Sequence, residues 1–294
     1  MGWTTTEHAQ EFLDAAGPLL RADAASNTML LTAAASVAAD GPEVFGDEPP
    51  LFGWWAGVLG RIDGAFIHSP PHPAQLSALP NAAVDPLAEL LADRERPLTG
   101  VGAAGHVAEA FATAWCARRD VIAEIALRLR LYRLAALHEP DPAPPGRAAV
   151  ATAADGVLVR AWIEAVGLET GAVIGASRTL DERLAAGALT IWRDPSDTPV
   201  ALAGYSREVD GTRRINAVYT VAPHRRRGYG AAVTAVTCRR ALDSGTSRLL
   251  LYADVDNPTS NALYRRLGFE PVEDRTVLRF EPHAGVAATA RGER

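Results

Sequence analysis

Residues 221–230 constrain the fold of this chain more than any other stretch, and they read V-A-P-H-R-R-R-G-Y-G. A β-branched run over 215–221 predicts a strand, which Pro223 ends because proline has no backbone N–H to donate. Gly228 and Gly230 follow, and an apolar helical pattern begins directly after them. A strand, a glycine-rich turn and a helix N-terminus together bind phosphate through backbone N–H groups. The stretch therefore predicts a phosphate-binding turn within an α/β fold.

The spacing Arg225-x-x-Gly228-x-Gly230 resembles the pyrophosphate loop of the GNAT superfamily of N-acetyltransferases. Further along the chain, residues 257–269 read N-P-T-S-N-A-L-Y-R-R-L-G-F, which is similar to the fourth helix and the LY-x-x-x-GF signature of that family. The two motifs stand in the family's order, and the resemblance spans roughly 188–280. It implies an α/β (α+β) fold with a mixed, mostly antiparallel central sheet flanked by helices. It also implies an N-acetyltransferase that uses acetyl-CoA as co-substrate.

The resemblance assigns the contacts to acetyl-CoA residue by residue. It implies that backbone N–H groups of the loop hold the pyrophosphate, and that the end of the preceding strand faces the acetyl group and pantetheine arm. The residues expected to bind acetyl-CoA are Tyr219, Thr220, Val221, Arg225, Arg226, Arg227, Gly228, Tyr229, Gly230, Ala231 and Asn257. The Val221 amide is the expected polariser of the thioester carbonyl. Tyr264 is the expected catalytic acid, which protonates the departing thiolate.

Two of these residues also fit a purely structural role. Tyr264 falls on the apolar face of its helix with Leu263 and Leu267, so it also fits a core tyrosine. Asn257 precedes Pro258, and asparagine followed by proline is a typical start of a helix. For Asn257 the capping role and the binding role are compatible.

The sequence identifies no general base. Members of the family often carry a glutamate on the strand that leads into the phosphate loop, but residues 213–221 contain no carboxylate. Glu208 and Asp210 lie upstream in a predicted turn, and His224 is expected to face solvent. A water relay is therefore the expected route for the proton of the amine.

A proline-rich run over 139–147 predicts a linker between two domains. The expected division is an N-terminal α/β domain at 1–139, the linker at 140–147, the acetyl-CoA-binding catalytic domain at 148–282 and a disordered tail at 283–294.

The two halves share a coarse order of elements. The first half begins with helical patterns over 5–20 and 24–38 and ends with a strand-like alternation over 125–137. Where a phosphate loop would fall it has Leu-Pro-Asn-Ala-Ala at 79–83, with neither arginine nor glycine. Only one acetyl-CoA site is therefore expected. Two interpretations of the first half stay open: a degenerate acetyltransferase-like repeat, and an unrelated α/β cap.

Two further motifs are weaker. Residues 100–105 fit G-x-G-x-x-G, but the acidic residue that a dinucleotide site needs would be Asp120, which follows a helical pattern rather than a strand. A strand-to-helix turn is the favoured interpretation. His68 and His72 are four residues apart, but the prolines between them exclude a regular helix, so no metal site is expected.

Composition limits the partners and the compartment. The formal net charge of -6 argues against nucleic acid as the main partner. The sequence has no lysine, which excludes lysine-based chemistry and, with its many alanines and prolines, suggests a GC-rich bacterial genome. Cys116 and Cys238 fall on apolar helical patterns and are expected to be free thiols in a reducing cytosol. No signal peptide and no long apolar run is visible, so a cytoplasmic protein without a membrane partner is expected.

The expected reaction is transfer of an acetyl group from acetyl-CoA to a primary amine of a small molecule or peptide. The amine would attack directly in a ternary complex, since Cys238 falls in the middle of a helical pattern and no nucleophilic cysteine stands near the motif to support a covalent route. Two alternatives stay open: a non-catalytic acyl-CoA-binding module that acts in regulation or interaction, and an acyltransferase that uses longer acyl-CoA.

Overall fold

The computed structural model describes residues 1–94, 96–170 and 177–283. It divides the described chain into two compact units, one formed by Met1–Leu129 together with the residues from Asp274 to His283, and the other by Arg130–Glu273. The predicted disordered tail, apart from His283, lies outside the described residues.

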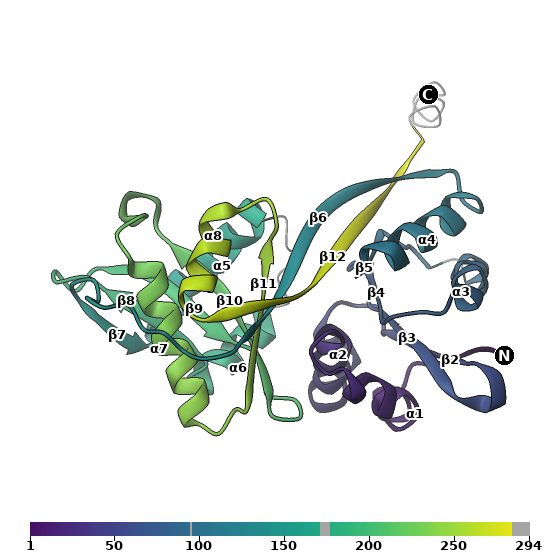
Figure 1. Ribbon diagram of the computed structural model, residues 1–294, viewed down its shortest axis with the longest axis horizontal. Coiled ribbons are helices and arrows are strands. Elements are labelled where there is room, and N and C mark those ends of the chain that lie inside the picture. The colour runs from purple at the N-terminus through teal and green to yellow at the C-terminus, as the bar shows by residue number, and fades with distance from the viewer. Residues whose placement is uncertain (95, 171–176, 284–294) are drawn as a thin grey trace. The chain divides into compact units, whose positions relative to one another are not determined.

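The elements follow one another along the chain as labelled in Figure 1. The first half contains β1 (Gly2–Thr6), α1 (Ala9–Ala22), α2 (Thr28–Asp40), β2 (Leu51–Ala56), β3 (Ile62–His68), β4 (Ala74–Leu76), α3 (Asn81–Asp93), β5 (Gly100–Ala104), α4 (Gly105–Cys116) and β6 (Val121–Leu134). The second half contains β7 (Arg147–Val150), α5 (Gly156–Thr170), α6 (Ser177–Ala185), β8 (Leu189–Arg193), β9 (Pro199–Tyr205), β10 (Thr212–Thr220), α7 (Tyr229–Asp243), β11 (Arg248–Asp254), α8 (Pro258–Arg266) and β12 (Phe269–Pro282). Short 3-10 turns lie at Pro42–Val44, Val58–Gly60, Ala153–Asp155 and Ala222–His224.

The two units repeat one strand order. In the first unit the hydrogen-bonded order is β1-β2-β3-β4-β5-β12-β6, and in the second it is β7-β8-β9-β10-β11-β6-β12. The fourth and fifth strands of each unit, β4 with β5 and β10 with β11, pair in parallel, and the other pairs with a known register are antiparallel. Each unit also has two helices after its first strand and one after each of its fourth and fifth. The mixed, mostly antiparallel sheet flanked by helices that the sequence predicted is confirmed, and the repeat favours a tandem over an unrelated cap.

The boundary between the units differs from the predicted one. The division falls inside β6, between Leu129 and Arg130, and inside β12, between Glu273 and Asp274. The proline-rich run belongs to the second unit, where the carbonyl of Pro145 accepts a hydrogen bond from the indole of Trp192 at 3.2 Å. Composition could not show this, because β6 and β12 each supply strand residues to both units, and no local signal marks where a strand changes unit.

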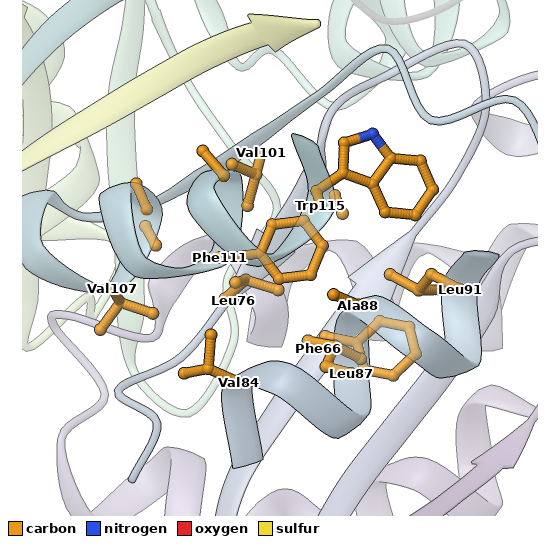
Figure 2. Close-up of a cluster of buried hydrophobic side chains, with 14 of the residues drawn as sticks. Phe66, Leu76, Val84, Leu87, Ala88, Leu91, Val101, Val107, Phe111 and Trp115 are labelled. Atoms are coloured by element: carbon orange, nitrogen blue, oxygen red, sulfur yellow. The ribbon is translucent and has the colours of Figure 1, made fainter. Parts of the chain in front are cut away.

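The core of the first unit lies where α3 and α4 pack against its strands. In Figure 2 the ring of Phe111 of α4 lies on the side of that helix that faces Leu87 and Leu91 of α3. The ring centroid of Trp115, at the end of α4, lies 5.9 Å from that of Phe280 of β12. The chain start differs from its prediction, because the helical pattern expected over 5–20 is a strand that ends at Thr6 and a helix that begins at Ala9. The first residues pair with β2 instead, through the register Gly2↔Ala56 to Thr6↔Phe52.

A buried arginine fills the place where the parallel strands of the first unit end their pairing. The β4–β5 ladder joins Ala74 to Val101 and Gln75 to Gly102. Next to it the guanidinium of Arg275, from β12, donates to the carbonyls of Leu76 at 3.0 Å, Gly102 at 3.3 Å and Ser26 at 3.3 Å. Arg275 is only 5% exposed. The guanidinium thus occupies the space between the fourth and fifth strands of this unit.

We expect Arg275→Met to lower the free energy of unfolding by about 3 kcal/mol or more, because buried carbonyls would lose their donor. The matched control is Arg279→Met in the same strand, where the arginine side chain is 61% exposed and pairs with Glu281 at 3.6 Å. Urea denaturation followed by circular dichroism measures both. The control should change stability by no more than about 0.5 kcal/mol, and equal effects of the two substitutions would contradict the role given to Arg275.

Candidate active site

The site begins at a bulge in β10. Pairing of β10 with β9 joins Asn216 to Gly204 and Tyr219 to Leu202, so two residues of β10 face one residue of β9 between those pairs. Ala217, inside this bulge, has a φ of 53°. A bulge leaves an extra residue outside the ladder and re-aims the side chains that follow. Its backbone groups at Ala217 and Val218 therefore lack ordinary ladder partners on β9.

The same strand loses its partner on the other side. β10 and β11 pair in parallel over 212–215 and 248–251. Among the described residues the ladder goes no further, although β10 continues to Thr220 and β11 to Asp254. Residues 216–220 are each partly exposed, whereas β9 beside them is buried after its first residue. The end of β10 therefore borders an opening near the centre of the sheet of this unit.

The predicted phosphate loop leads from this opening into α7. Gly228 precedes the helix at a φ of 85°, in the left-handed region that favours glycine. Gly230 lies in the first turn, and a Cβ added to it would come within 3.1 Å of Oγ1 of Thr220. The free N–H groups of the first helical turn follow directly, at the positive end of the helix dipole. The backbone therefore forms a binding site, or cradle, for an anion. A side chain at Gly228 would strain the backbone, and one at Gly230 would lie close to Thr220.

A pocket of about 650 Å³ joins the loop, the bulge and α8. Ten residues assigned from the sequence line it: Tyr219, Thr220, Arg225, Arg226, Gly228, Tyr229, Gly230, Ala231, Asn257 and Tyr264. Two others, Val221 and Arg227, are not among its lining residues. Sequence reasoning missed Glu169 of α5 and Arg266 of α8, which also line it.

The position of Val221 corrects one prediction. Its backbone N–H donates to the carbonyl of Val200 at 3.1 Å, within the sheet. An N–H already bound to a neighbouring strand is not available to polarise a thioester carbonyl, so the predicted role of Val221 is wrong. The bulge at Ala217 and Val218 is the part of the strand that has lost its regular pairing, and Val218 lines the pocket.

Arg225 is held by protein groups rather than left open to a ligand. Its Nη2 reaches both carboxylate oxygens of Glu169, at 2.6 and 2.9 Å, and its Nε donates to the carbonyl of Thr220 at 3.0 Å. The hydrogen bond that Arg225 donates to Glu169 is the main reason why the pKa of Arg225 is raised. Arg225 therefore ties α5 to the phosphate loop, a role that the motif alone did not indicate. No sequence signal marks Glu169, because it lies on an ordinary amphipathic helix far from the motif.

Two other arginines of the pocket have no ion-pair partner among the described residues: Arg226, at a φ of 63°, and Arg266 at the end of α8. Both are available to an anionic ligand at the end of the pocket that carries the phosphate loop.

Tyr264 is both a core residue and a pocket residue. Its ring centroid lies 6.4 Å from that of Tyr132 and 6.1 Å from that of Phe269. Burial, and then the neighbouring Cys238, raise the pKa of its hydroxyl well above the usual range. The hydroxyl is therefore neutral and still carries its proton at any physiological pH.

Asn257 caps α8, as one of its two interpretations predicted. Its side-chain oxygen accepts the N–H of Ser260 at 3.1 Å, and its amide nitrogen has no partner among the described residues. Asn261, which accepts the hydroxyl of Tyr132 at 2.7 Å, donates to the carbonyl of Asn257 at 2.7 Å. Through Tyr132, strand β6 therefore holds the start of α8, the helix that carries Tyr264.

The three candidate bases are placed differently from one another. Glu208 accepts the hydroxyl of Thr246 at 2.8 Å and pairs with Arg213 at 3.3 Å. Glu208 and Asp210 both precede β10, whereas the pocket borders the other end of that strand. His224 was expected to face solvent, but it is half-buried and lines the pocket, and its Nδ1 has no hydrogen-bond partner among the described residues.

The described residues contain no group of three or more histidine, cysteine, aspartate or glutamate side chains arranged to hold a metal ion. A search of the same residues for helices long and apolar enough to cross a membrane found none.

Comparison with known sequences matches the second unit. The acetyltransferase (GNAT) family model matches residues 160–269. A mycothiol acetyltransferase from Corynebacterium jeikeium (strain K411) is 37% identical over 76 residues, which cover 25% of this chain and 22% of that protein. The matched part thus spans less than a quarter of the relative's length.

Solved structures match nearly the whole chain. A GCN5-related N-acetyltransferase from Sphaerobacter thermophilus has a TM-score of 0.58 at 18% identity, covering 94% of this chain and 95% of that chain. A tandem GNAT protein from the clavulanic acid biosynthesis pathway has a TM-score of 0.56 at 14% identity, covering 95% and 98%. At such identities the likeness shows the fold alone. One of these similar folds is a tandem arrangement.

We expect Gly228→Val to weaken acetyl-CoA binding by about tenfold or more, since a residue other than glycine at this φ costs about 1–2 kcal/mol and a branched side chain crowds the cradle. The matched control is Gly245→Val, because Gly245 also has a positive φ, 94°, but has open space around it and lies outside the pocket. Isothermal titration calorimetry measures both affinities. Equal affinities of the two variants would show that Gly228 does not shape the binding loop.

Proposed function

Residues 160–269 form an acetyltransferase (GNAT) domain, and from this premise we propose that the protein transfers the acetyl group of acetyl-CoA to a primary amine. The observation that carries the proposal is a single pocket that joins an anion cradle, an opened strand pair and a neutral buried tyrosine. Acetyl-CoA offers a matching set of groups in the same order: a pyrophosphate, an extended arm and a thioester.

The pocket of the second unit offers groups that could bind the pyrophosphate, the pantetheine arm and the thioester of acetyl-CoA. The backbone at Gly228 and Gly230 would hold the pyrophosphate, and Arg226 and Arg266 would add charge-assisted hydrogen bonds to phosphate oxygens. The amide nitrogen of Asn257 would donate to the pantetheine arm. The backbone of the bulge at Ala217 and Val218 replaces Val221 as the proposed polariser of the thioester carbonyl.

The proposed reaction is a direct transfer. The neutral amine attacks the carbonyl carbon, a carbon–nitrogen bond forms, and the carbon–sulfur bond breaks. The amine loses a proton to solvent through water, and the departing thiolate takes a proton from the hydroxyl of Tyr264. Tyr264 then regains a proton from solvent, which closes the cycle. Cys238 is an unsuitable nucleophile, since it is fully buried and burial raises its pKa to about 12.

The acceptor proposed here has an amine of low pKa, because Glu169 is the only carboxylate among the described residues that line the pocket, and it is paired with Arg225. An α-amine with a pKa near 7.8 is about one-third neutral at pH 7.5, whereas a lysine side chain is only about 0.1% neutral. This difference of roughly 300-fold corresponds to about 3.4 kcal/mol that a water relay does not supply. α-Amines and amino sugars are therefore the proposed acceptors. The cytoplasmic location and bacterial origin stay predictions.

We expect Tyr264→Phe to lower kcat by about 10²–10⁴-fold while the KM for acetyl-CoA changes little, because only the proton donor is removed. Tyr205→Phe is the matched control, since Tyr205 is equally buried in the same core but does not line the pocket. Stopped assays of CoA thiol release give both constants. A folded Tyr264→Phe enzyme with full turnover, under conditions where chemistry limits the rate, would assign Tyr264 to the core alone.

We expect kcat/KM for an α-amine acceptor to rise with pH up to the pKa of the amine, near 8, and then to stay level to about pH 10. The upper limb stays level because burial raises the pKa of Tyr264, so this acid keeps its proton as the pH rises. At pH 7, α-amines and amino sugars should react faster than lysine-type amines. A screen in which lysine-type amines react fastest would contradict the proposed acceptor class and require a base within the pocket.

A further inference from the structure

A buried guanidinium in the second unit has no acidic partner among the described residues. Arg183, on α6, donates from Nη2 to Oδ1 of Asn216 at 2.5 Å. Its Nε is buried and has no hydrogen-bond partner among the residues that the structure describes. Burial lowers its pKa to about 10, and no carboxylate offsets this effect. Arg183 therefore keeps a positive charge at neutral pH that no acidic group in the described part of the chain balances.

The acids nearest to it in the sequence are used elsewhere. Asp181 pairs with Arg160 of α5 at 3.4 Å, and Glu182 pairs with Arg207 at 3.8 Å. The residues at 171–176, which precede α6, include no acidic side chain. A buried cation without a counter-charge is costly, and an anion brought in by a ligand would offset that cost.

The positive charge of Arg183 lies near the part of β10 where the acceptor is expected to bind. Asn216 is the first residue of β10 beyond its ladder with β11. The extra residue of the bulge turns both Asn216 and Tyr219 to the side of the strand that faces α5 and α6. Asn216 accepts the hydrogen bond from Arg183 of α6, and the ring of Tyr219 lies 5.8 Å from that of Trp162 of α5. At about 3.3 Å per strand residue, Asn216 lies within roughly 10 Å of Tyr219 and the pocket.

We propose that the amine acceptor carries an acidic group, a carboxylate or a phosphate, which binds to Arg183 and Asn216. This inference rests on the proposed acetyl transfer and names the substrate class of the same site. The Nε of Arg183 and the amide nitrogen of Asn216 are donors without partners among the described residues, and guanidinium groups bind such anions through paired hydrogen bonds. The acid would be held at the start of the opening while the amine reaches the thioester.

The first test compares acceptors that differ only in the acidic group. Alanylalanine and its C-terminal amide share an α-amine, and glucosamine 6-phosphate and glucosamine share an amino sugar. We expect kcat/KM to be at least about tenfold higher for the charged member of one pair, and that pair identifies the carboxylate or the phosphate. Equal or lower values for the charged members of both pairs would overturn the inference but leave acetyl transfer in place. If no member of either pair is acetylated, the proposed function fails, and the inference fails with it.

The second test removes the charge. In Arg183→Met the ratio of kcat/KM between charged and neutral acceptors should fall to about 1, whereas Arg183→Lys should retain part of it. Arg160→Met is the control, since it removes a guanidinium of α5 that already has its own partner, and it should leave the ratio unchanged. Calorimetric binding of acetyl-CoA shows that each variant is folded. A folded Arg183→Met variant with the same ratio as the original protein would overturn the inference. If that variant does not fold, Arg183→Lys is measured at 0.5 M salt, because salt weakens the attraction of a lysine for an anion more than that of a guanidinium bound to the anion by two hydrogen bonds. A ratio in Arg183→Lys that equals that of the original protein at this salt concentration would also overturn the inference.

Discussion

The pairing of β10 with β11 stops after Ile215 and Leu251, and the rest of the site depends on this interruption. A central strand normally satisfies its backbone groups on both sides, so groups beyond the last pair must find other partners. The bulge that follows at Ala217 removes regular pairing on the β9 side as well. The result is a stretch of central strand that is partly exposed and can face a ligand with its backbone.

The two units place different groups at the same position of one fold. Both have a parallel pair of strands at the same place in the order, followed by a helix. In the first unit Arg275 binds the carbonyls beside that pair, Leu79 is buried, and Pro80 stands where the helix begins. In the second unit the same place holds a pocket and a glycine in the left-handed region. The difference lies in a few side chains rather than in topology.

The three consecutive arginines at 225–227 have different surroundings. Arg225 is neutralised by Glu169 and connects α5 to the loop. Arg226 lines the pocket with no ion-pair partner among the described residues, and Arg227 is exposed and does not line it. Identical side chains thus differ in their contacts because the positive φ at Arg226 turns the backbone between them.

The sequence by itself determined the local parts of this protein. The strand, the glycine-rich turn, the start of α7 at Tyr229 and the cap at Asn257 were predicted, because each depends on near neighbours in the chain. Tyr264, which lines the pocket, was assigned to the site by its place in a motif that resembles the family signature. Only the tertiary structure decided the division inside β6 and β12, the pairing of Glu169 with Arg225, and the bond that removes the Val221 amide from the site. These features join residues that lie far apart in the sequence, and which backbone groups keep a partner is settled only when the strands have paired.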